Sequence, residues 1–226
     1  MQARRILLPL LVMLPVLAVL LGLGTWQVQR LGAKNALLAE IAAGEAAPAR
    51  PLGGAAPPSW TKVAVTGRFD HEREVLLGLE VRGPILGARL VTPLLRDGAP
   101  PVLVDRGWVP MDKSGTIARP AGPVTIEAYA RPGETAGMMS ATDDPAGRRF
   151  YTFDPPVIAR SLGLAAPEPF GLVALGGPGG GLPDPARTLP RPTNSHLGYA
   201  ITWYGLALSL LGVFAVWLRR RLKEPA

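Results

Sequence analysis

Two long uncharged stretches, one near each end of the chain, restrict the possible folds more than any other feature. The first runs from Ile6 to Gln29 and the second from Pro192 to Leu218, and both are strongly apolar. A helix that crosses a bilayer needs about 20 consecutive, mostly apolar residues. Pro9 and Pro15 do not exclude this role for the first stretch, because transmembrane helices tolerate proline. We therefore expect a membrane protein with two transmembrane helices, one N-terminal and one C-terminal.

A cleaved signal peptide is the alternative interpretation of the first stretch. Its apolar run is longer than the apolar core of an ordinary signal peptide. No A-x-A cleavage site follows it, since the chain leaves the stretch as GLGTWQVQR. We therefore interpret the first stretch as a retained membrane anchor.

The formal net charge of +7 is concentrated at the two tips of the chain. The tips contain six basic residues and one acidic residue, namely Arg4, Arg5, Arg219, Arg220, Arg221, Lys223 and Glu224. The rest of the chain holds 18 basic and 16 acidic residues and so carries only +2. A nearly neutral middle does not suit a nucleic-acid partner, which would need clustered phosphate contacts. Because basic flanks stay on the cytoplasmic side, we expect both termini in the cytoplasm and the middle across the membrane.

These observations divide the chain into five segments. We expect a cytoplasmic tip at residues 1–5, a transmembrane helix at 6–28, an extracytoplasmic domain at 29–195, a second transmembrane helix at 196–218 and a cytoplasmic tip at 219–226. Beyond the first span, apolar residues still recur at three- and four-residue spacings. The first helix is therefore expected to leave the membrane and to end near Gly44.

The middle domain has the pattern of a mainly β (α+β) fold. Val63 and Val65 alternate with other residues in VAVTGRF, as in a half-buried strand. Further strands are expected in EVLLG, ARLVTPLL, PVLVDRGWV, PVTIEAYA, FYTFD and FGLVALG, and a short helix in PPVIARSLGL. The Gly/Pro-rich residues 44–59 and 176–193 are interpreted as a linker and as a mobile or extended connection. An antiparallel sheet, an open barrel or a small sandwich fits this pattern best.

The residues for catalysis or metal binding are few. The absence of cysteine excludes disulfides, Cys-ligated zinc, iron–sulfur clusters and thiol catalysis. No G-x-S-x-G nucleophile motif occurs, and two histidines are too few for a histidine-rich metal site. Three groups have ordinary interpretations: His71 as an exposed turn residue, Asp143 and Asp144 as a solvated turn, and Met138 and Met139 as core or linker residues. We therefore do not expect an enzyme.

His196 stands at the outer end of the second span. On a helical wheel it shares a face with aromatic and apolar residues, namely Tyr199, Trp203, Ala207, Leu210, Phe214 and Trp217. Small residues lie roughly opposite, at Gly198, Thr202, Gly205, Ser209 and Gly212, and the first span offers Ala18 and Gly22. We expect the two spans, or one span and a partner's span, to pack through these small residues. The histidine face would then meet lipid, a partner or a flat apolar ligand.

The residues of this face leave two interpretations of His196 open. A histidine beside aromatic rings at the membrane edge can bind haem iron through a ring nitrogen. Alternatively, Tyr199, Trp203 and Tyr204 belong to the aromatic belt at the membrane interface, and His196 only forms a hydrogen bond near the start of its helix.

Three sequence blocks follow one another along the chain. In the first, G-x-W-Q-x-x-R-x-x-x-K, the matching residues are Gly24, Trp26, Gln27, Arg30 and Lys34. The second is VLVDRGWVP at residues 102–110, and the third, N-x-H-L-x-Y-A-x-T-W, begins at Asn194. Together they resemble the surfeit locus protein 1 family of cytochrome c oxidase assembly factors, in its bacterial type. The second block departs from the family pattern at Asp105, where asparagine is usual.

The resemblance implies a role in maturing the haem-copper oxidase, in bacteria or in the mitochondrial inner membrane. For the bacterial type, we expect the protein in the plasma membrane with its central domain in the periplasm. The resemblance also implies that the protein binds haem a and assists its insertion into cytochrome c oxidase subunit I, with His196 as the ligand of the haem iron. Subunit I and membrane lipid are the expected partners, and haem a synthase is a further candidate. The alternative is a membrane scaffold that binds no haem and stabilises oxidase assembly intermediates.

Other residues are candidates for contact with the haem. Tyr199 and Trp203 are expected to stack on the ring. Arg30 and Lys34, which share a helix face, are expected to meet haem propionates or lipid headgroups near the outer membrane surface.

Arg106 has two interpretations. It can pair with a haem propionate, because guanidinium groups bind carboxylates well. Alternatively it belongs to a strand end in which Gly107 forms a bulge and Trp108 fills the core.

Overall fold

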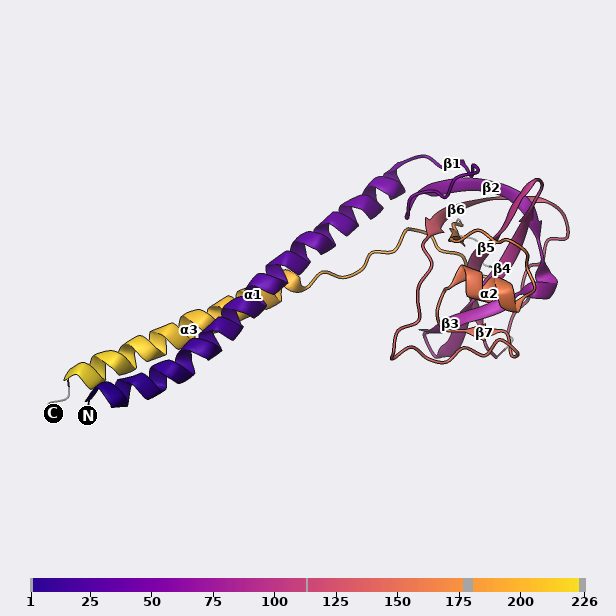
Figure 1. Ribbon diagram of the computed structural model, residues 1–226. Helices are drawn as coiled ribbons and strands as arrows, with labels where there is room; N and C mark the ends of the chain where they lie inside the picture. The colour runs from indigo at the N-terminus through magenta and orange to yellow at the C-terminus, as the bar shows by residue number, and fades with distance from the viewer. Residues whose placement is uncertain (1, 113, 177–180, 224–226) are drawn as a thin grey trace. The chain divides into compact units, whose positions relative to one another are not determined.

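The computed structural model describes residues 2–112, 114–176 and 181–223. The chain forms two compact units. The helical unit comprises the residues up to Glu40 and from Arg191 onward, and the sheet unit comprises Ile41–Pro190. Figure 1 shows the elements of both units in chain order.

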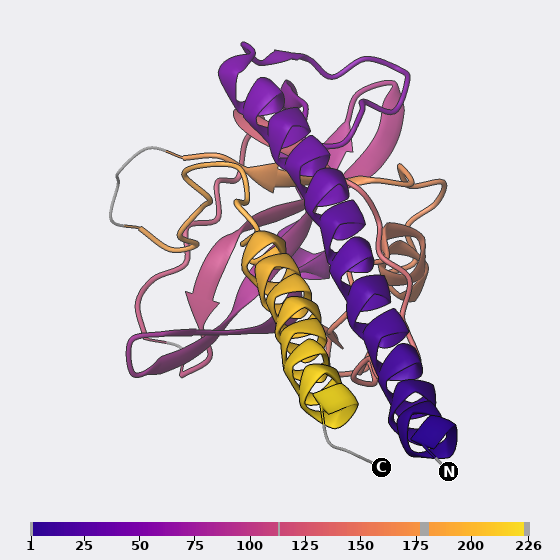
Figure 2. The same ribbon diagram turned by 90° about the vertical axis from the view of Figure 1, so that its left-hand side faces the viewer.

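The helical unit is built from two long helices, α1 (Gln2–Ala46) and α3 (His196–Lys223), which lie side by side in Figures 1 and 2. Both are long and apolar enough to cross a membrane, as the sequence predicts. The 45 residues of α1 extend over about 68 Å at 1.5 Å per residue. A bilayer core is about 30 Å thick, so α1 continues well beyond any membrane it crosses. It ends close to Gly44, also as predicted.

The two helices pack through the histidine-bearing face of α3, so the prediction that they pack on each other through their small residues is wrong, and packing of these residues on a partner's span stays a prediction. The buried residues of α3 are Ala200 and Ala207, and Met13 and Gln27 are buried on α1. The small residues are exposed instead, at Gly198, Thr202, Gly205, Ser209 and Gly212 of α3 and at Ala18 and Gly22 of α1.

Local contacts explain this choice of face. Gly24 makes room for the ring of Tyr204, since a Cβ at Gly24 would lie 2.8 Å from a ring carbon. The Tyr204 hydroxyl also lies 3.1 Å from Oγ1 of Thr25. The hydroxyls of Thr202 and Ser209 donate to carbonyls of their own helix. The small-residue face therefore needs no second helix to satisfy its hydroxyl groups.

The strands of the sheet unit form one sheet in the order β1-β2-β6-β8-β5-β4-β3-β7. They are β1 (Arg50–Pro51), β2 (Lys62–Phe69), β3 (Val75–Arg82), β4 (Ile85–Arg96), β5 (Ala99–Pro110), β6 (Val124–Arg131), β7 (Arg149–Phe150) and β8 (Gly171–Ala174). Every segment predicted as a strand contributes residues to one. The domain is therefore mainly β, as expected.

The sheet is mixed, which corrects the expectation of an antiparallel sheet. Strand β8 runs parallel to β5 and antiparallel to β6, and it separates the two. The short strands β1 and β7 also pair in parallel, with β2 and β3. Alternation of apolar residues indicates a strand but not its direction, so the pattern left this undecided. An additional pairing of β2 with β4 curls the sheet, which is not a closed barrel.

The segment FYTFD forms a strand only at its first residue, within β7, and the prediction of a strand along it is wrong. Phe150 and Phe153 are both fully buried, at a spacing of three that a strand does not allow on one face.

Asp154 then caps α2 (Pro155–Ser161), because its carboxylate accepts the N–H of Val157 at 3.1 Å. This helix, with proline in its first turn and Gly163 just after its end, is predicted correctly. Its Ile158 packs on the core under β3, β4 and β5.

Part of the connection back to α3 packs against the sheet, which favours the extended over the mobile interpretation of this segment. Asp184 exchanges two backbone hydrogen bonds with Trp108, at 2.8 and 2.9 Å, and Leu189 is 2% exposed. Residues 177–180 of the predicted connection lie outside the described residues.

Met138 and Met139 are fully exposed and so are loop rather than core residues.

Candidate functional site

His196 is the first residue of α3, and its ring is anchored to α1. Its Nδ1 lies 2.7 Å from Oε1 of Gln27, a side chain that is 8% exposed. The backbone N–H of His196 donates to Oδ1 of Asn194 at 3.4 Å. Asn194 in turn donates through Nδ2 to Oδ1 of Asn35 at 2.8 Å. Both the ring and the start of α3 are therefore fixed to α1, while the described residues offer Nε2 no hydrogen-bond partner.

The aromatic residues near His196 differ in accessibility. Tyr199, one turn along α3, is 55% exposed. Trp203, two turns along, is half-buried. A flat ligand held at His196 therefore has the Tyr199 ring available beside it, and Trp203 contributes mainly to the packed face.

The basic residues expected near the site follow Gln27 on α1. Arg30 is exposed, and the described residues give it no ion pair. At 1.5 Å rise per residue it lies about 4.5 Å farther along the helix axis than Gln27, and half-buried Lys34 about 10.5 Å farther. Both positions share the side of α1 that carries Gln27. They could neutralise carboxylates of a ligand bound at His196.

The Arg106 guanidinium is held by partners within the sheet unit. Its side chain is 7% exposed, and Nη1 donates to Oε1 of Glu74 at 3.0 Å. It also donates to the carbonyl of Ala118 and lies over the Phe69 ring, with Cζ 4.7 Å from the centroid. These partners favour the structural interpretation of this segment, and a contact with a haem propionate stays a prediction.

His71 joins the same network, so its interpretation as an exposed turn residue is wrong. Its Nδ1 lies 2.9 Å from Oε1 of Glu74, and Nε2 lies 3.0 Å from the carbonyl oxygen of Pro120. The side chain is only 18% exposed. Sequence spacing could not reveal the contact with Pro120, because that residue lies 49 positions farther along the chain. Asp143 and Asp144, by contrast, accept backbone N–H groups in a turn, as expected.

The segment at Arg106 contains the predicted bulge. Opposite β4, Leu90 pairs with Gly107 and Val91 with Asp105, which leaves Arg106 as the extra residue. Gly107 has φ +136°, and a Cβ there would lie 2.3 Å from the Asp184 carbonyl oxygen. Asp105 and Arg106 contact different partners, Arg89 and Glu74 respectively.

Asp105 forms a second buried ion pair in the sheet unit. Arg89 donates through Nε to both carboxylate oxygens, at 2.9 and 3.1 Å, and the Gly107 N–H donates at 3.0 Å. Burial raises the pKa of the Asp105 carboxyl, and the charge and hydrogen bonds of Arg89 offset only part of this effect. Ionisation of this carboxyl therefore costs more free energy in the folded chain than in the unfolded chain.

Replacement of Asp105 by asparagine should change how stability depends on pH. A raised pKa in the folded state means that the folded chain binds the proton more tightly than the unfolded chain. The wild-type free energy of unfolding should then fall as pH rises from about 3.8 through the raised folded value. Urea unfolding of the full chain between about pH 4 and 7 should show this fall reduced in Asp105→Asn. Parallel pH profiles of the two proteins would contradict the prediction.

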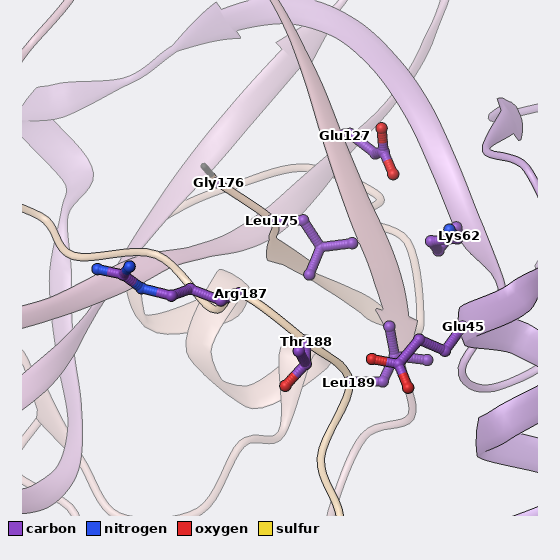
Figure 3. Close-up of a pocket in the computed structure, with 8 residues that line it drawn as sticks. All are labelled: Glu45, Lys62, Glu127, Leu175, Gly176, Arg187, Thr188 and Leu189. Carbon is purple, nitrogen blue, oxygen red and sulfur yellow. The ribbon is translucent and has the colours of Figure 1, made fainter. Parts of the chain in front are cut away.

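The cavities of the sheet unit have mixed linings of polar and apolar residues. One of about 270 Å³ lies between Glu45, Lys62 and Glu127 on one side and Arg187 on the other, as Figure 3 shows. Another, of about 510 Å³, includes Arg89 and Asp105. No group of three or more His, Asp or Glu side chains gathers as metal ligands within the described ranges.

The residues that the sequence suggests for a haem site lie in the helical unit, outside these cavities. His196 offers a ring nitrogen, Tyr199 an exposed aromatic face and Arg30 a cation for a propionate. The residue that sequence reasoning overlooked is Gln27. It stands in the first sequence block, but only the packing of α1 on α3 places it behind His196.

The chain matches known proteins along most of its length. The family model described as SURF1 family matches residues 14–208. A SURF1-like protein of Monosiga brevicollis is 33% identical over 229 residues, which cover 92% of this chain and 87% of that protein. Surfeit locus protein 1 of Homo sapiens is 32% identical over 229 residues, covering 87% and 72%. A SURF1-like protein of Rickettsia conorii is 28% identical over 211 residues, covering 89% and 88%.

Proposed function

The chain belongs to the SURF1 family, and from this premise we propose that it binds haem a and assists its insertion into subunit I of cytochrome c oxidase. Membership of the family implies a role in the assembly of cytochrome c oxidase. The handling of haem a is the step that we add from the residues of this chain.

The observation that carries the proposal is the hydrogen bonding of the two ring nitrogens of His196. Nδ1 is bonded to Gln27, whereas Nε2 has no partner among the described residues. The histidine stands at the end of a helix long enough to span a membrane. A ring nitrogen in this position would bind haem iron, and the exposed Tyr199 ring would supply aromatic surface beside it.

A single protein ligand suits a carrier. Haem delivery requires release as well as binding, and one histidine with stacking contacts would hold haem less firmly than two protein ligands would. In the proposal Arg30 pairs with a propionate, supported by Lys34. Arg106 is assigned to the fold, because Glu74 and the Ala118 carbonyl already occupy its guanidinium.

The proposed location follows from the charged tips. Both termini lie in the cytoplasm under the positive-inside rule, so the sheet unit lies in the periplasm of a bacterial plasma membrane. His196 then lies at the periplasmic end of its span, beside the outer leaflet. A lipophilic haem can pass from this position to subunit I within the membrane, and haem a synthase is the proposed donor. In this role the protein acts as a carrier rather than an enzyme.

The proposal is tested by the haem content of the purified full-length protein. We expect haem a bands in protein from a bacterium that makes haem a, in a ratio near one haem per chain. The matched control is the same protein from a strain that lacks haem a synthase. Colourless protein that still co-purifies with subunit I would contradict haem handling and support a scaffold that binds no haem.

A further inference from the structure

We propose that Gln27 is a positioning residue for His196, which holds the ring proton on Nδ1 and so makes Nε2 the atom that binds the haem iron. The inference rests on the proposed haem-binding function. It adds the group that decides which ring nitrogen can act as the ligand.

The geometry of the contact identifies the donor. Oε1 of Gln27 is a carbonyl oxygen, which only accepts hydrogen bonds, so Nδ1 of His196 must donate across the 2.7 Å contact. A neutral imidazole carries one proton, and the other nitrogen then has the free lone pair. The bond made by one ring nitrogen decides which nitrogen is left to bind a metal. In this structure that nitrogen is Nε2.

The surroundings keep the ring in this orientation. Gln27 is 8% exposed on the face of α1 that packs on α3. A turn of the His196 ring would leave the buried amide oxygen without a donor, which is unfavourable. The Asn35–Asn194 bond and the bond from the His196 N–H to Asn194 fix the start of α3 independently. The backbone that carries the ring is therefore held as well.

An amide in this position has a different effect from a carboxylate. A carboxylate behind a metal-binding histidine raises the basicity of the ring and strengthens its bond to the metal. Gln27 orients His196 without placing a full negative charge beside it. This combination of a fixed ring and an uncharged support matches a protein that must pass its haem on.

A role for Gln27 in joining the two helices is the competing explanation, and it predicts a different result. Such a role would change the stability of the helix pair but not the position of the ring proton. The Thr25–Tyr204 bond at 3.1 Å also joins α1 and α3 and does not involve His196. Tyr204→Phe removes that bond and is therefore the matched control for Gln27→Met, which keeps the side-chain length.

The test is nuclear magnetic resonance of isotopically labelled histidine in the haem-free, full-length protein in detergent, at a pH where both imidazoles are neutral. The chain has two histidines, and His71→Asn assigns their signals. We expect His196 to carry its proton on Nδ1 in the wild type and in Tyr204→Phe. In Gln27→Met we expect the form with the proton on Nε2 to become dominant.

Titration with haem a supplies the second measurement. Loss of such a supporting hydrogen bond typically weakens metal affinity by about 10–100-fold, so we expect this change in Gln27→Met and less than about twofold in Tyr204→Phe.

The outcomes separate this inference from the proposed function. A wild-type proton on Nε2 overturns the inference, and this measurement needs no variant. So does a folded Gln27→Met protein that keeps the proton on Nδ1, or one that binds haem a as tightly as the wild type. A wild type with the proton on Nδ1 that binds no haem a contradicts the proposed function and leaves the assignment of the ring proton standing.

Discussion

The His196→Ala variant of the full chain should be purified without haem a from cells in which the wild type carries it. The ring of His196 is the one axial ligand that the helical unit is proposed to supply, through Nε2. Loss of a hydrogen-bonded partner of a metal ligand already costs about 10–100-fold in affinity, so loss of the ligand should cost at least as much. Visible absorption of the purified protein, normalised to protein concentration, measures the change.

The chain offers a matched control in its other histidine. His71 is bonded to Glu74 and to the Pro120 carbonyl within the sheet unit. His71→Ala should therefore retain the wild-type haem content. Full haem in His196→Ala would remove His196 from the site, and loss of haem only in His71→Ala would move the site to the sheet unit.

The Glu74→Ala variant is expected to lower the free energy of unfolding of the sheet unit by about 3–5 kcal/mol, the usual result of breaking a buried ion pair from one side. Glu74 is 9% exposed and accepts hydrogen bonds from Arg106 and Arg119. Arg106 is 7% exposed and would lose its carboxylate partner. Burial already lowers the pKa of Arg106, and the Glu74 charge opposes this effect. Most of the loss should come from Arg106, since Arg119 is 47% exposed and screened by water.

Pulse proteolysis of the full chain in increasing urea measures this loss, because it follows the fraction of unfolded sheet unit. Glu72→Ala is the matched control, since Glu72 is an exposed residue of the same short helix, His71–Arg73. We expect it to change the free energy of unfolding by less than about 0.5 kcal/mol. Equal urea midpoints for the two variants would show that the Glu74–Arg106 pair does not stabilise the sheet.

The candidate site shows how far local pattern can reach. His196, Tyr199 and Trp203 could be placed on one helix face from spacing alone, because a helix repeats every 3.6 residues. The same spacing gave the wrong packing face, since a stripe of small residues looks like an interface whether or not a second helix lies on it. The two helices pack through the histidine-bearing face instead, where Gly24 leaves room for the Tyr204 ring and Oε1 of Gln27 lies 2.7 Å from Nδ1 of His196.

The fold of the sheet unit could also be predicted only in part from the sequence. Strand positions, the bulge at Gly107 and the capped helix after Asp154 could be predicted, because alternation, turn residues and caps act over a few neighbouring residues. The insertion of β8 between β5 and β6 could not, because it depends on where the chain returns after α2.

The amino-acid sequence by itself determined the two long apolar helices, the mainly β middle and the concentration of net charge at the tips. Each of these follows from composition or from contacts between near neighbours in the chain. Only the tertiary structure decided that Gln27 stands behind His196, across 169 positions of sequence, and that Glu74 holds Arg106, across 32. Such pairs depend on how whole elements pack, and no periodicity within a single element records which residue of another element will face it.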